Sequence, residues 1–198
     1  MLGFHLGDRP TVHQHVAVLR RRFRSRYWVL RHLRSAGFNN EDLVTVYKTI
    51  LRPVADYLCV FYHSILTDEQ DELIERLQSQ ALKSIFGWKI PYADLRRMAG
   101  VSTLRQRRIN MADKFAEAAA ASPRFQRWFP RRRAARAASR VGDKYVETFA
   151  RCDRLRNSPI HYMRRRLNGK EGMRYGERNR QYRDTEEDGI TLRRQARN

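Results

Sequence analysis

The sequence predicts a mainly α-helical protein, a helical bundle with a short β segment before it and a basic, partly disordered tail after it. Apolar residues recur at steps of three and four along most of residues 8–123, the spacing of one helix face. Residues that start or stop helices, such as Asn39, Gly87 and Gly100, divide this stretch into about five helices. We expect a β segment at 1–7, the bundle at 8–123, a basic closing segment at 124–168 and a disordered tail at 169–198.

The first helix is expected between the turn at Asp8-Arg9-Pro10 and a cap at Gly37. Its core face is expected to contain Val16, Leu19, Phe23, Tyr27 and Leu30. Another face carries Arg20, Arg24, Arg31 and Arg34, and it is widened by Arg21, Arg22 and Arg26. Trp28 and His32 lie among these arginines. Because arginines contact phosphates and aromatic rings stack on bases, this face is a candidate nucleic-acid-binding surface.

The second helical segment has the most regular apolar periodicity of the chain. Asn39 or Asn40 is expected to cap it, and its core face is expected to contain Val44, Tyr47, Leu51, Val54, Leu58 and Phe61. Pro53 lies inside this segment and lacks a backbone donor, so it should kink or split the helix near Leu51.

Three more helices are expected between residues 67 and 123. A capping box at Thr67-Asp68-Glu69-Gln70 should start a helix that ends at Gly87, with a core face of Ile74, Leu77, Ala81 and Ile85. Residues 91–99 predict a short helix that Gly100 ends. Ser102 or Thr103 should cap the last one, whose inward face would be Leu104, Ile109, Ala112, Phe115 and Ala119.

The charge of the chain indicates a polyanionic partner. Among 198 residues, 41 are Lys or Arg and 21 are Asp or Glu, which gives a formal net charge of +20. A compact domain with this charge repels itself unless a polyanion neutralises it, so nucleic acid is the expected ligand. Arg131-Arg132-Arg133 opens a further basic segment, and we expect residues 131–198 to contribute little to folding but much to non-specific affinity.

Other classes of site are not indicated. Cys59 and Cys152 are isolated and predict neither a disulfide framework nor a zinc site, which suits a reducing nuclear or cytoplasmic compartment. His13 and His15 diverge around a helix and are expected at the surface. We find no apolar run long enough to span a membrane and no secretory signal, so we expect neither a membrane partner nor secretion.

The order of several motifs carries a family resemblance. The motifs are Leu2-Gly3-Phe4; Tyr47-Lys48, Arg52-Pro53 and Tyr57; His63, Leu66 and Thr67; Glu75, Arg76, Gln78, Ala81, Leu82, Ile85 and Gly87; Pro91-Tyr92 with Leu104, Arg107 and Arg108; and residues 125–130 and 154–168. In this order and spacing they resemble the thumb and downstream region of the reverse transcriptases of LINE-type (non-LTR) retrotransposons. Leu58 departs from the family pattern, in which a small residue is common, and Phe61-Tyr62 replaces a more usual tryptophan.

The resemblance implies a fragment of an RNA-directed DNA polymerase that binds an RNA template and a DNA primer, or their hybrid, through the phosphate backbone. It makes Leu2-Gly3-Phe4 similar to the primer grip at the end of the palm. The catalytic carboxylates and their Mg²⁺ would belong to a palm that the motifs do not cover, so we expect no catalytic residue, metal or cofactor and no enzyme activity from this chain alone. Tyr92-Ala93-Asp94-Leu95 lacks the second aspartate of a YxDD-type motif.

The candidate nucleic-acid-binding residues are Leu2, Gly3, Phe4, Arg20, Arg21, Arg24, Arg31, Arg34, Lys48, Arg52, Arg131, Arg132 and Arg133. Two alternatives share the same residues: a stand-alone basic α-helical nucleic-acid-binding protein, and a functionless remnant of an element. The coding sequence upstream of Met1 would separate these alternatives, because palm motifs there would identify a fragment of a full enzyme. No small-molecule substrate is indicated.

Overall fold

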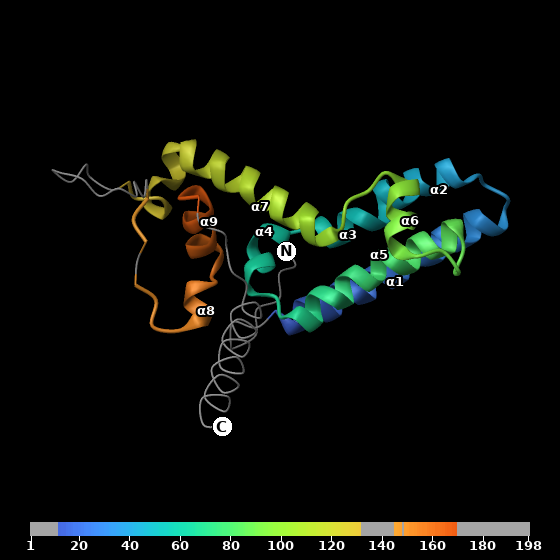
Figure 1. Ribbon diagram of the computed structural model, residues 1–198, viewed down its shortest axis with the longest axis horizontal. Helices are drawn as coiled ribbons and strands as arrows, with labels where there is room; N and C mark the ends of the chain where they lie inside the picture. Colours follow the sequence, from blue (N-terminus) through green and yellow to red (C-terminus); the bar gives the residue numbers. More distant parts are fainter. Residues whose placement is uncertain (1–11, 132–144, 148, 170–198) are drawn as a thin grey trace, which may run out of the picture. The chain divides into compact units, whose positions relative to one another are not determined.

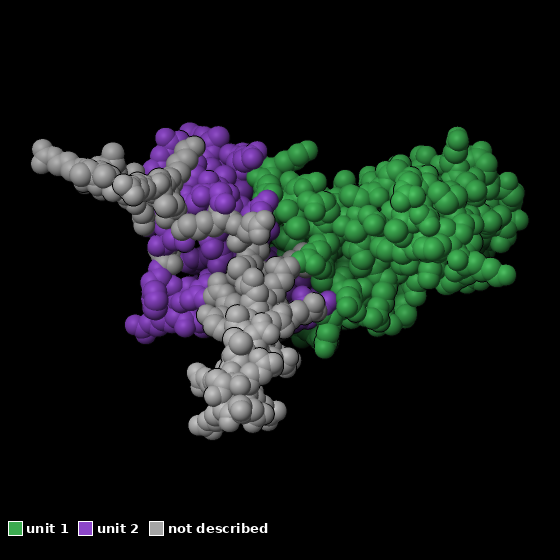
Figure 2. Space-filling model, viewed as in Figure 1, with its two compact units in different colours: residues 1–63, 69–115 green, residues 64–68, 116–198 purple. Residues whose placement is uncertain are grey.

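The computed structural model describes residues 12–131, 145–147 and 149–169, and these residues are mainly helical (Figure 1). The chain divides into two compact units, unit 1 with residues 1–63 and 69–115 and unit 2 with residues 64–68 and 116–198 (Figure 2). The expected β segment at residues 1–7 lies outside the described residues, and so does the expected tail apart from Gly169.

The first helix, α1 (His13–Ser35), has the predicted core face. Val16, Leu19, Phe23 and Leu30 are buried, but Tyr27 is only half-buried. The expectation of surface histidines is wrong for His15, whose ring is buried and lies 4.9 Å from the ring centre of Tyr62. The helix ends just before Gly37, which has the positive φ of +86° expected of a glycine cap.

The second segment is split where Pro53 predicts it. It consists of α2 (Asn40–Val46), a π-helical stretch η1 (Tyr47–Leu51) and α3 (Arg52–Asp56). The side chain of Asn39 caps α2 by accepting a hydrogen bond of 2.8 Å from the amide of Asp42. At the end of η1 the amide of Arg52 donates to the carbonyl of Tyr47, five residues earlier. The wider turn lets the helix continue through Pro53.

The apolar periodicity of this segment fails at its end. Leu58 has a left-handed backbone with φ of +56°, and the chain changes direction there into the short helices α4 (Cys59–Tyr62) and η2 (His63–Ile65). Consequently Leu58 is only half-buried and Phe61 is exposed, so the expectation that both lie in the core is wrong. The left-handed backbone favours glycine at position 58, because a Cβ atom strains this conformation.

Three further helices of the chain begin and end close to the predicted positions. They are α5 (Asp68–Phe86), α6 (Tyr92–Ala99) and α7 (Leu104–Ala121). The predicted core residues of α5 are all buried, and Gly100 ends α6 with φ of +58°. Thr103 rather than Ser102 caps α7, since its hydroxyl accepts a hydrogen bond of 3.0 Å from the amide of Gln106.

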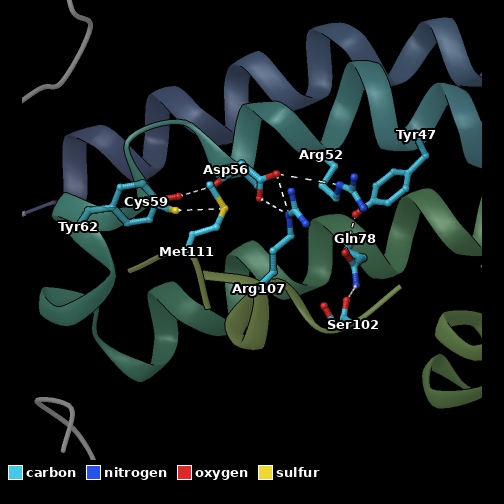
Figure 3. Close-up of polar contacts among 10 residues, drawn as sticks. Tyr47, Arg52, Asp56, Cys59, Tyr62, Gln78, Ser102, Arg107 and Met111 are labelled. Carbon is cyan, nitrogen blue, oxygen red and sulfur yellow. Dashed lines mark hydrogen bonds and ion pairs between the residues drawn. The ribbon is translucent and has the colours of Figure 1, made fainter. Parts of the chain in front are cut away.

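Many of the motif residues form a polar network inside unit 1 (Figure 3). Gln78 of α5 accepts a hydrogen bond from the Tyr47 hydroxyl and donates to the Ser102 carbonyl at 2.9 Å and to the Tyr92 hydroxyl at 2.8 Å. Burial raises the pKa of Tyr47 well above its usual range, so this hydroxyl stays protonated and acts as a donor. The network joins α5 to η1, α6 and the loop before α7.

Glu75 extends this network to the start of α7. Its carboxylate accepts a hydrogen bond from the Tyr92 hydroxyl and further bonds of 3.3 Å from the amides of Leu104 and Arg105. A negative charge at this place is favourable because the first amides of a helix carry partial positive charge.

Two ion pairs complete the interior of unit 1. Nε of Arg107 donates hydrogen bonds to both carboxylate oxygens of Asp56, at 2.8 and 3.0 Å (Figure 3). Arg108 is fully buried and pairs with Asp71, which is also buried. Arg107 and Arg108 of α7 therefore join this helix to α3 and α5.

Unit 2 contains the C-terminal part of α7, η3 (Pro123–Trp128), α8 (Asp153–Arg156) and α9 (Pro159–Leu167). Its buried apolar residues include Ala119, Phe129, Tyr145, Ala150, Tyr162 and Met163. The side chain of Asn168 exchanges hydrogen bonds of 2.9 and 3.1 Å with the backbone of Tyr145. The expectation that the chain beyond Pro130 contributes little to folding is therefore wrong for residues 145–169, which supply much of the core of this unit.

Candidate nucleic-acid interface

The candidate interface is the solvent face of α1 in unit 1. Residues 13–38 contain seven arginines and no Asp or Glu. At 100° per residue, Arg20, Arg24, Tyr27, Arg31 and Arg34 fall within about 80° of one another around the helix axis. We call the four arginines of this row the arginine stripe. Its centre lies about 80° from the centre of the buried face, so the stripe runs along the border of the core.

Most of the arginine stripe is free to bind an external anion. Arg20, Arg24 and Arg31 are exposed, as is the neighbouring Arg21. Among the described residues none forms an ion pair with these four arginines, whereas Arg52, Arg76, Arg97, Arg105, Arg107 and Arg108 all pair with carboxylates. The like charges on α1 therefore repel one another without internal compensation.

Arg34 also has a structural role. Its guanidinium donates a hydrogen bond of 2.9 Å to the Asn40 side chain and another to the carbonyl of Ile85 in the last turn of α5. A cation at this carbonyl satisfies one of the unpaired acceptors at the end of a helix. A substitution of Arg34 would therefore disturb the packing of α1 on α5 as well as any ligand.

A groove opens beside the C-terminal half of the stripe, with a volume of about 520 Å³. It is lined by Tyr27, Arg31, Arg34 and Ser35 of α1, by Gln80 and Ser84 of α5, and by Trp88. Sequence reasoning did not select Trp88, because residues 87–90 fall between two predicted helices and the groove exists only once α1 and α5 lie side by side. The sequence feature that could have pointed to Trp88 is its position directly after Gly87, the glycine that ends a predicted helix.

The remaining candidates are placed differently. Arg52 pairs with Asp56 at 4.0 Å inside the ion-pair network, and Lys48 is half-buried on η1. Arg131 is exposed in unit 2, where it forms an isolated antiparallel bridge with Tyr145. The other five, Leu2, Gly3, Phe4, Arg132 and Arg133, lie outside the described residues.

Comparison of the chain with protein-family models, with curated proteins and with solved structures finds no match. In the part of the chain that the structure describes, no three His, Cys, Asp or Glu side chains are grouped so that they could hold a metal ion. No helix within residues 12–131 and 145–169 is both long and apolar enough to cross a membrane. The candidate function therefore rests on α1 and its groove.

Proposed function

We propose that this chain is the thumb-like and downstream region of a LINE-type reverse transcriptase and that it binds template-primer nucleic acid along the arginine stripe. The observation that carries the proposal is a helix without acidic residues whose exposed arginines Arg20, Arg24 and Arg31 have no carboxylate partner among the described residues. Phosphates would supply the missing counter-charge, and guanidinium groups bind them in bidentate fashion.

The length of the stripe suits several phosphates of one strand. Arg20 and Arg31 are eleven residues apart, which is about 16 Å along a helix axis. One strand of a duplex carries a phosphate about every 3.4 Å of its axis, so this length corresponds to about five nucleotides. Contacts of this kind fix the position of a duplex without reading its sequence, which is what a polymerase needs of a template-primer.

The test is the salt dependence of binding to an RNA–DNA hybrid. We expect the triple variant R20Q/R24Q/R31Q to bind more weakly and to reduce the slope of log affinity against log salt by about 0.7–0.9 for each phosphate that the variant no longer neutralises. Arg34 is left unchanged because it also holds the end of α5. Glutamine keeps the helix propensity, so the melting temperature should stay within a few degrees.

A matched control removes the same net charge elsewhere. R76Q/R97Q/R124Q changes three exposed arginines, two of which pair with carboxylates on their own helices. If binding follows net charge alone, both triple variants reduce the slope equally and the proposed interface is refuted. A reduction confined to the α1 variant supports it.

A further inference from the structure

The groove beside the arginine stripe has the chemistry of a nucleotide site. Trp88 is 65% exposed although its indole is large and apolar, and it lies directly after the helix stop at Gly87. Gly87 has φ of +126°, a conformation that side chains other than glycine rarely adopt, and this turn directs the chain away from α5. The turn thus leaves an aromatic side chain at the edge of a cationic groove.

The other walls of the groove offer charge and hydrogen bonds. Arg31 has a guanidinium without an ion-pair partner in the described part of the chain, and the guanidinium of Arg34 donates hydrogen bonds to Asn40 and to the end of α5. The hydroxyl of Ser84 donates to the carbonyl of Ala81 at 2.7 Å, which leaves its oxygen lone pairs as acceptors. Gln80 adds an exposed amide, and none of the described residues that line the groove is a carboxylate.

An indole ring beside two guanidinium groups suits a ligand that contains both an aromatic ring and a negative charge. We propose that the groove binds one unpaired nucleotide of a template or primer strand, with its base stacked on Trp88 and its phosphate on Arg31. An unpaired base offers its faces for such stacking, whereas the bases inside a duplex are stacked on each other. The inference rests on the proposed function. Arg31 and Arg34 belong both to the arginine stripe and to the groove, so a duplex bound along the stripe would adjoin the nucleotide in the groove.

The test compares a blunt RNA–DNA hybrid with the same hybrid that carries a short single-stranded overhang. We expect W88A to weaken binding of the overhang hybrid by about 5- to 150-fold, the usual loss for one stacked base, and to leave binding of the blunt hybrid unchanged. W88F keeps an aromatic ring and should weaken binding much less. The control is F149A, because Phe149 is also an exposed aromatic residue, at 85%, but lies in unit 2 and does not line the groove.

A direct readout is the fluorescence of Trp88. The chain has three tryptophans, so W28F/W128F leaves Trp88 as the only one. We expect the overhang hybrid to quench its fluorescence and the blunt hybrid to leave it unchanged. Equal effects of both probes, or equal losses of affinity in W88A and F149A, overturn the nucleotide site.

The two proposals fail in different ways. If R20Q/R24Q/R31Q binds the blunt hybrid as well as the unsubstituted chain does, the arginine stripe is not the interface and the proposed function fails. If that variant loses blunt-hybrid binding while W88A keeps full preference for the overhang, the proposed function stands and the nucleotide site is refuted.

Discussion

The two charges of the buried pair Arg108 and Asp71 should differ in how much stability is lost when the partner is removed. The side chain of Arg108 is 1% exposed and that of Asp71 is 11% exposed. Asp71 has a second cation, since Nε of Arg105 lies 3.8 Å from its other carboxylate oxygen. Arg108 has no second anion among the described residues, and its Nε and Nη1 atoms have no hydrogen-bond partner there.

The two single substitutions should therefore differ in cost. D71N leaves the Arg108 charge buried and uncompensated, and we expect it to lower the free energy of unfolding by about 3–5 kcal/mol. R108M keeps most of the buried volume and leaves Asp71 beside Arg105, so we expect a loss of about 1–3 kcal/mol. The double variant R108M/D71L, which buries no charge at this position, should be more stable than D71N alone.

Urea unfolding followed by circular dichroism measures all three values on one scale. The variants must share the slope of the unmodified chain, so that differences in midpoint report stability. A larger loss for R108M than for D71N would refute the reasoning, because it would mean that packing of the arginine side chain, and not its isolated charge, dominates the pair.

Three further predictions follow from the fold and the resemblance. Leu58→Gly should be about 0.5–1 kcal/mol more stable than Leu58→Ala in urea unfolding, the reverse of the order inside a helix, because glycine adopts the left-handed backbone without strain; the ordinary order would contradict that conformation. Burial raises the pKa of the Cys59 thiol to about 11, so at pH 8 a thiol reagent should label the exposed Cys152 quickly and Cys59 only after unfolding; rapid labelling of both in the folded chain would show that Cys59 is accessible. With Mg²⁺, deoxynucleotides and a primed template, the chain alone should incorporate no nucleotide, and template-dependent extension by the purified chain would contradict the proposed assignment.

Local signals predicted the helix boundaries well. Asn39, Gly87 and Gly100 act through hydrogen bonds and backbone angles of their immediate neighbours, so their effect can be read from adjacent residues. Leu58 was the exception: nothing nearby marks a left-handed backbone at a leucine, and the regular spacing of apolar residues continues past it. The expectation of a buried Phe61 failed for this reason.

The site was predictable only in part. The arginine stripe follows from helical spacing on one element, and its exposure needs no knowledge of other elements. The groove depends on how α1 and α5 pack, and so does the anchoring of Arg34 on Ile85. The burial of His15 depends on another distant contact, with Tyr62 of α4. These features belong to pairs of residues that are distant in the sequence, such as Arg34 and Ile85 at 51 positions apart, and single-residue patterns do not contain them.

The carboxylate of Glu75 has a consequence for the order in which the chain folds. It holds the first amides of α7 from a position 29 residues earlier in the chain, and the same carboxylate accepts a hydrogen bond from the Tyr92 hydroxyl in α6. The first turn of α7 thus gains its stabilising anion only after α5 has formed and docked. In native-state hydrogen exchange, the amides of Leu104 and Arg105 should therefore open together with α5 and not fray independently as the ends of helices usually do.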